Sequence, residues 1–282
     1  MKHYMTGWRD IRRRQNGSNP VQSAKMNSFG IIRVNRLRRA AERAREVLGG
    51  ETDSDFPAPG SPWENGGFEH DVYESTSGWF RSSVDPEKLL GVFKALRLKE
   101  GFGLRAYEFR SGGNGNGVIW AVPVDAPVLE PDECPKLEGV FLEPPKPPGA
   151  VELMSVIEGD GSPWSYLSAS ILAREAVEFG AVWHGCSWSA NTILGKPPWE
   201  MAKLVATENV QPEEMWEWQG AVPDTWLPTY KEQGETKEIT LHVYTGLGQQ
   251  QIYCETDTYQ PGSYDLETKV EVVSLGGRGY IY

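Results

Sequence analysis

The residues best suited to covalent chemistry are His184 and Cys186, in the segment WHGCSWS at 183–189. A cysteine becomes a useful nucleophile when a nearby cation or helix N-terminus lowers its pKa and a histidine serves as base. Two positions apart on an extended strand, these side chains share a face, with Cα atoms roughly 6–7 Å apart. We expect Cys186 to be a buried, small apolar residue beside a hydrogen-bonded His184. The alternative is that the pair serves a thiol-dependent hydrolase or transferase.

Three other local patterns give weaker indications of a catalytic, phosphate-binding or metal site. The acid pairs Glu158/Asp160 and Glu213/Glu214 resemble the carboxylates of hydrolases, but surface acids are expected throughout an acidic chain. The glycine-rich stretch 111–117 precedes a β-type run and not the helix that a phosphate-binding loop requires, so we expect a hairpin tip. No CxxC or HxxxH spacing occurs in the sequence. We therefore expect no metal site and no cofactor.

Positive charge is concentrated near the N-terminus. Residues 1–50 carry twelve Lys and Arg against three acids, a net charge of +9, which leaves 16 basic and 36 acidic residues, or −20, for the rest. Such a segment can bind nucleic acid or dock on an acidic surface. The candidate binding residues are five arginines of one segment and the first tryptophan: Arg33, Arg36, Arg38, Arg39, Arg43 and Trp8.

Two classes of partner remain open for this basic segment. Arginines with a nearby tryptophan can neutralise phosphates and stack a base, which favours a nucleic-acid-binding protein acting through residues 1–48. The acidic remainder of the chain, however, repels polyanions and attracts the basic segment. We expect the segment to contact a protein partner or the protein's own acidic body.

A helix over residues 31–48 must position these arginines. The apolar residues at 34, 37, 41, 44 and 48 recur at spacings of three and four, and two glycines end the pattern. The chain therefore begins with a basic arm and helix over 1–50. A linker-like segment over 51–84 follows, because much of it combines acids, Pro and Gly without periodicity.

The body, residues 85–282, is predicted to be α+β, with a mixed sheet, a β-hairpin, a few helices and a C-terminal antiparallel meander. Helices are expected over 85–99 and 163–179, because a capping residue followed by a proline marks the start of each, Asp85-Pro86 and Ser162-Pro163. Alternating runs after residue 238 predict the meander. A proline-rich stretch over 125–150 is where the body would divide. Shorter elements are expected as strands at 151–157 and 181–183 and a helix at 198–205.

Composition narrows the setting. Tryptophan is enriched, at 11 of 282 residues, which favours core packing, with stacking on bases, sugars or prolines as the alternative. The sequence has no run of 18 apolar residues and no apolar core of a secretory signal near its start, so we expect a cytoplasmic protein without membrane contact. The odd number of cysteines, three, fits a reducing compartment.

The leading hypothesis is a non-catalytic binding or accessory protein that acts through an aromatic-rich body and the basic arm. The first alternative is a thiol enzyme that uses Cys186 and His184. The second is a nucleic-acid-binding protein that uses residues 1–48.

Overall fold

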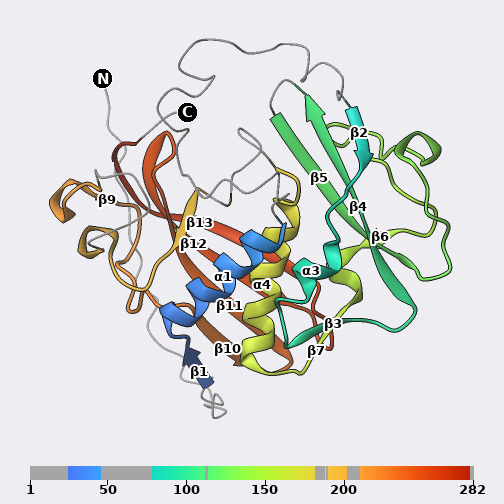
Figure 1. The fold of residues 1–282 in the computed structure, drawn as a ribbon. Helices are drawn as coiled ribbons and strands as arrows, with labels where there is room; N and C mark the ends of the chain where they lie inside the picture. The colour runs from blue at the N-terminus through green and yellow to red at the C-terminus, as the bar shows by residue number, and fades with distance from the viewer. Residues whose placement is uncertain are drawn as a thin grey trace, which may run out of the picture.

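A large antiparallel sheet, sheet A, is the main layer of the computed structural model, which describes residues 25–45, 78–111, 114–181, 188, 190–201 and 210–279. The strands of sheet A are β1 (Lys25–Ser28), β8 (Asn191–Ile193), β9 (Glu217–Trp218), β10 (Thr229–Gln233), β11 (Thr236–Thr245), β12 (Gln249–Tyr259) and β13 (Leu266–Arg278). They follow the order β1-β10-β11-β12-β13-β9 (Figure 1). Strand β8 also pairs with β11. Strands β10, β11, β12 and β13 pair in the order in which they follow one another along the chain, so the predicted C-terminal meander is confirmed.

A second sheet, sheet B, contains the predicted hairpin. Its strands are β2 (Gly78–Arg81), β4 (Phe102–Ser111), β5 (Asn114–Pro123) and β6 (Val151–Glu152), in the order β2-β4-β5-β6. Ser111 pairs with Asn114, and residues 112–113 lie outside the described residues. Strand β2 lies within the segment expected to be a linker, and residues 51–77 are outside the described part. Strands β3 (Leu96–Leu98) and β7 (Ile157–Gly159) form a separate pair.

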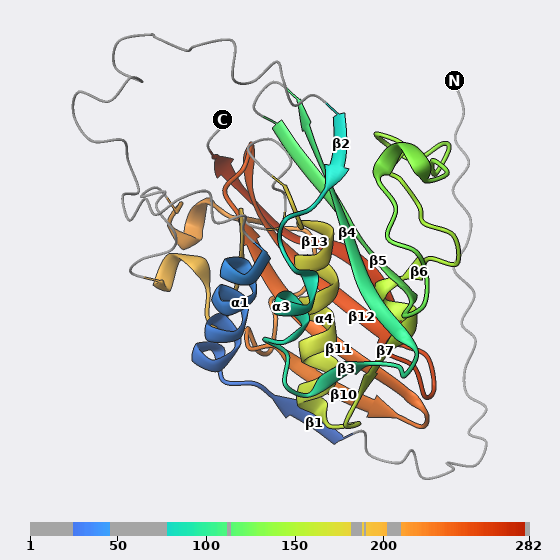
Figure 2. The same ribbon diagram turned by 45° about the vertical axis from the view of Figure 1, so that its right-hand side comes forward.

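Two helices lie side by side against sheet A (Figures 1 and 2). They are α1 (Ile31–Arg45) and α4 (Pro163–Val177), and both confirm predicted helices. The Ser162 hydroxyl caps α4 by accepting a hydrogen bond from the backbone N–H of Ser165. The apolar face of α4 and the inward side chains of β11 belong to one core cluster that includes Leu167, Ile171, Leu172, Ile239, Leu241 and Val243. Helix α4 is therefore the central element of the fold.

The helix predicted over 85–99 is wrong in its length. Helix α3 spans only Pro86–Leu90, and the N–H of Gly91 closes it by donating to backbone carbonyls within the helix. The chain then turns, and Leu96 begins β3. Phe93 and Leu96 are still buried in the core, so their helix-like spacing reflects burial along a helix, a turn and a strand.

Three shorter predictions also change. The strand predicted at 151–157 is interrupted by a 3₁₀ turn at Leu153–Val156, in which a serine hydroxyl donates to a backbone carbonyl 2.6 Å away. Of the strand predicted at 181–183, the first residue is not in a strand and the others lie outside the described residues. Of the helix predicted at 198–205, only a 3₁₀ turn at Pro198–Glu200 is described, up to residue 201. None of the described helices has both the length and the apolar character needed to cross a membrane.

Candidate interaction site

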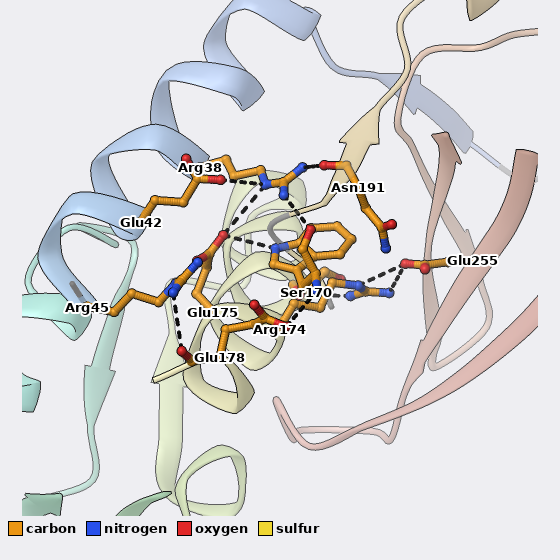
Figure 3. Close-up of polar contacts among 10 residues, drawn as sticks. Arg38, Glu42, Arg45, Ser170, Arg174, Glu175, Glu178, Asn191 and Glu255 are labelled. Carbon is orange, nitrogen blue, oxygen red and sulfur yellow. Dashed lines mark hydrogen bonds and ion pairs between the residues drawn. The ribbon is translucent and has the colours of Figure 1, made fainter. Parts of the chain in front are cut away.

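Two arginines of helix α1 point into the protein. Arg38 and Arg45 are only 6% and 4% exposed, on the same face as the buried Val34 and Ala41. The guanidinium of Arg38 donates to the backbone carbonyls of Asn191 and, over 2.6 Å, Trp188. Because these two carbonyls lie more than a hundred residues away along the chain, Arg38 ties α1 to a distant segment (Figure 3).

Glu175 of α4 is the centre of this buried network. Its side chain is fully buried and accepts hydrogen bonds from Arg45 Nε at 2.7 Å and Trp188 Nε1 at 2.9 Å. Arg38 Nε lies 3.7 Å from the same carboxylate and 3.1 Å from Glu42 (Figure 3). Burial raises the pKa of Glu175, and the nearby arginines oppose this shift. Burial likewise lowers the pKa of Arg38. Each charge is tolerated inside the protein because opposite charges lie beside it.

A second buried ion-pair group fixes α4 to sheet A. Arg174 donates to both carboxylate oxygens of Asp257, at 2.7 and 3.0 Å, and to Glu255 at 2.9 Å. Burial lowers the pKa of Arg174, but the hydrogen bonds and charges of these two acids outweigh burial and raise it. The guanidinium carbons of Arg38 and Arg174 lie 4.3 and 5.3 Å from the centre of the Trp188 ring. Charge and aromatic contacts therefore link α1, α4 and sheet A.

The opposite face of α1 presents a second set of arginines to solvent. Arg36, Arg39 and Arg43, which we call the arginine stripe, are all exposed, and none forms an ion pair within the described ranges. Their spacing of three and four places them on one side of the helix, together with Ile32, which is 69% exposed. The exposed Arg33 lies apart from the stripe, with its guanidinium 3.6 Å from the centre of the Trp164 ring. The stripe is a set of solvent-facing cations on a helix that is held in place.

The candidate residues from the sequence therefore separate. The five arginines all lie on α1, but Arg38 belongs to the buried network, whereas the arginine stripe faces solvent. Trp8, His184 and Cys186 lie outside the described residues. The buried partners Glu175, Asp257 and Glu255 were missed, because no local spacing connects them to the arginines that they bind.

A cleft of about 390 Å³ lies beside the buried network. Its lining comes from α4 and its C-cap, residues 188 and 191, and strands β12 and β13: Ala173, Arg174, Val177, Glu178, Trp188, Asn191, Glu255, Leu266 and Thr268. The charged groups in its walls already have protein partners, since Arg174 binds Glu255, and Glu178 accepts from the N–H of Trp188. Nowhere in the described ranges are three His, Cys, Asp or Glu side chains grouped to hold a metal ion.

Most described tryptophans pack inside the protein. Eight of the eleven are described, and each is buried or half-buried. Trp199 contacts three others, Trp216, Trp218 and Trp226, with ring centres 5.8 to 6.2 Å apart. Trp199, Trp216 and Trp226 also share a core cluster with Tyr244 and Ile252 of sheet A, so these rings serve as core.

His242 beside this cluster makes the stability sensitive to acid. It is 8% exposed, Nδ1 has no hydrogen-bond partner, and burial lowers its pKa. The unfolded chain therefore binds a proton at this residue below about pH 6.5, whereas the native state resists protonation. We expect stability to fall as the pH drops through this window, by up to about 1.4 kcal/mol per pH unit from this residue.

The substitution His242→Leu should reduce that loss. Urea unfolding of both proteins at about pH 8 and pH 5 measures it. Other titrating groups contribute equally to both proteins, so the variant should lose less stability between the two pH values. An equal loss in both proteins would contradict the assignment.

The arginine stripe is thus the exposed group whose geometry is best defined for contact with another molecule. Helix α1 holds the stripe in place, and its three arginines form no ion pair with any other residue that the structure describes. No family model, curated protein or solved structure matches this chain.

Proposed function

We propose that this protein is a non-catalytic binding protein whose arginine stripe receives an acidic surface of a partner protein. One observation supports the proposal: the arginines of α1 are divided between two faces. Arg38 and Arg45 fix the helix to the body through buried contacts, whereas Arg36, Arg39 and Arg43 point to solvent. Because the buried arginines hold the helix in place, the three exposed arginines keep a fixed geometry in which they can contact a partner.

The chemistry of the stripe suits carboxylates. From Arg36 to Arg43 the helix rises about 10 Å, so the three guanidinium groups match a patch about two helical turns long. A guanidinium can bind a carboxylate through two parallel hydrogen bonds. Ile32 lies on the same side, and it offers an apolar contact beside the charges. A short acidic patch fits this layout better than a long polyanion, because residues 51–282 carry a net charge of −20.

We place this binding in the cytoplasm. The thiols of Cys134 and Cys254 are free, which suits a reducing compartment. An alkylation assay on protein taken directly from cells would test the placement, because free thiols react and disulfides do not.

Binding of a short fluorescent peptide with about six glutamates tests the proposed function. We expect the triple variant Arg36→Glu, Arg39→Glu and Arg43→Glu to bind the peptide at least about tenfold more weakly in fluorescence anisotropy. The matched control is Arg81→Glu, Lys94→Glu and Lys136→Glu, which changes exposed cations on other segments by the same total charge. It should lose less than about threefold.

Two outcomes would overturn the proposal. Equal losses in both triple variants would show that total charge, and not the stripe, governs binding. Tighter binding of duplex DNA or single-stranded RNA of about 20 nucleotides, with a steep salt dependence, would favour the nucleic-acid alternative. Thermal unfolding checks that both variants stay folded, and the exposure of all six side chains predicts that they do.

A further inference from the structure

Strand β13 has a long edge that no described strand covers. One edge of β13 pairs with β12 over most of its length, whereas on the other edge β9 pairs only with Ser274 and Leu275. The carbonyl of Val273 also accepts a hydrogen bond from Gln219, 2.9 Å away. Residues 267–272 are all exposed, and no strand of the described chain pairs with their outer edge.

An edge of this kind carries backbone donors and acceptors that another strand can pair with. We call residues 267–272 the open part of β13, and a register shift ends it. Ile252 pairs with Ser274 and Tyr253 pairs with Val272, so Val273 is an extra residue in β13. The bulge separates the part that pairs with β9 from the open part. The open part is six residues long, close to the length of an ordinary strand.

The side chains of the open edge form two distinct faces. Glu267, Lys269 and Glu271 alternate in charge on one face, and Lys269 lies 3.0 Å from Glu271. On the other face, Val270 and Val272 are 53% and 41% exposed. Alternating charges can protect an edge from pairing, but their order also determines which pairing they would favour.

We propose that β13 pairs antiparallel with β13 of a second copy of this chain, about a two-fold axis at Val270. In this register each Lys269 lies opposite Glu271 of the second copy, and the two Val270 side chains are neighbours. The two opposite-charge pairs stabilise the contact by about 0.2–1 kcal/mol each, and the exposed valines become covered. The interface is self-complementary, as a two-fold axis requires.

Neighbouring registers are disfavoured by charge. Centring the axis on Lys269 places Glu267 opposite Glu271 of the second copy. Centring it on Thr268 pairs Lys269 with Glu267 but places Glu271 opposite Asp265. Like charges directly opposite each other destabilise a strand pair, so the order of charges favours the axis at Val270. The charges of this edge are therefore complementary to those of the same edge in a second copy. The inference does not depend on the arginine stripe, because it uses no residue of α1.

Charge exchange on β13 tests the pairing. Sedimentation equilibrium of the whole protein over about 1–100 µM should show a dimer. Its dissociation constant should rise at least about tenfold in Lys269→Glu and in Glu271→Lys. The double variant should recover the dimer. The matched control is Glu267→Lys, which reverses a charge on the same face opposite Val273 of the second copy, and it should change the dissociation constant by less than about threefold.

Mixing the two single variants provides the sharpest comparison. One copy then carries Glu at 269 and 271 and the other carries Lys at both, so the mixture should form a heterodimer with near-original affinity. The ion pair within each chain is not restored by mixing, so recovery can only come from contact between copies. A protein that stays monomeric over the whole range, single variants that dimerise normally, or a mixture that stays dissociated would each overturn the proposal.

Discussion

Replacing Glu175 with alanine is expected to lower the free energy of unfolding by about 3–5 kcal/mol. The fully buried carboxylate accepts hydrogen bonds from Arg45 and from the indole N–H of Trp188, and it lies 3.7 Å from Arg38. Its removal leaves these buried donors without their acceptor, and an uncompensated buried charge is costly. Urea unfolding followed by circular dichroism measures the loss.

Glu42→Ala is the matched control, because Glu42 contacts the same guanidinium as Glu175. Glu42 lies 3.1 Å from Arg38 but is 27% exposed and belongs to the same helix. Pairs of this kind contribute little, so the control should lose less than about 1 kcal/mol. If both variants lose the same stability, the buried network is not what fixes α1 to the body.

Asp257→Ala is expected to have an effect of similar size, again about 3–5 kcal/mol. Asp257 is fully buried, and it accepts two hydrogen bonds from Arg174 and one from the hydroxyl of Thr268 at 2.6 Å. The alanine variant leaves the buried guanidinium with only Glu255 as its acidic partner. Helix α4 then loses the two hydrogen bonds of Arg174 to Asp257 of β12, and the unfolding midpoint in urea should fall accordingly.

Thr268→Val separates the ion pair from the hydroxyl contact. This variant removes only the hydrogen bond to Asp257 and keeps the shape of the side chain, so we expect a loss of about 0.5–1.5 kcal/mol. Losses of equal size in Asp257→Ala and Thr268→Val would mean that Arg174 contributes little to the attachment of α4.

Elements held together by local patterns could be predicted from the sequence. Apolar spacing predicts α1, the N-cap and proline predict the start of α4, and alternation predicts the meander of sheet A. The same spacing carried a further signal in α1. Buried positions 34, 38, 41 and 45 form one helical face, so Arg38 and Arg45 occupy core-facing positions, whereas the arginine stripe lies opposite them.

Contacts between distant residues could not be predicted in this way. Arg45 binds Glu175 across 130 positions, and Arg174 binds Asp257 across 83. No local period connects such pairs. The error over 85–99 has a related cause, because Phe93 and Leu96 are buried by tertiary contacts although the helix has already ended at Gly91. His184 and Cys186, the candidates for chemistry, lie outside the described residues, so the thiol alternative stays a prediction.

Amide hydrogen exchange in α1 tests most directly whether the basic helix is a fixed part of the body that presents the arginine stripe. Peptides that cover Ile31–Arg45 and Pro163–Val177 can be followed together by mass spectrometry on the native protein. Because buried ion pairs join the two helices, we expect α1 to be protected to a level close to that of α4. Exchange of α1 at the rate of an unfolded chain, with α4 still protected, would contradict the account and identify α1 as a detached arm.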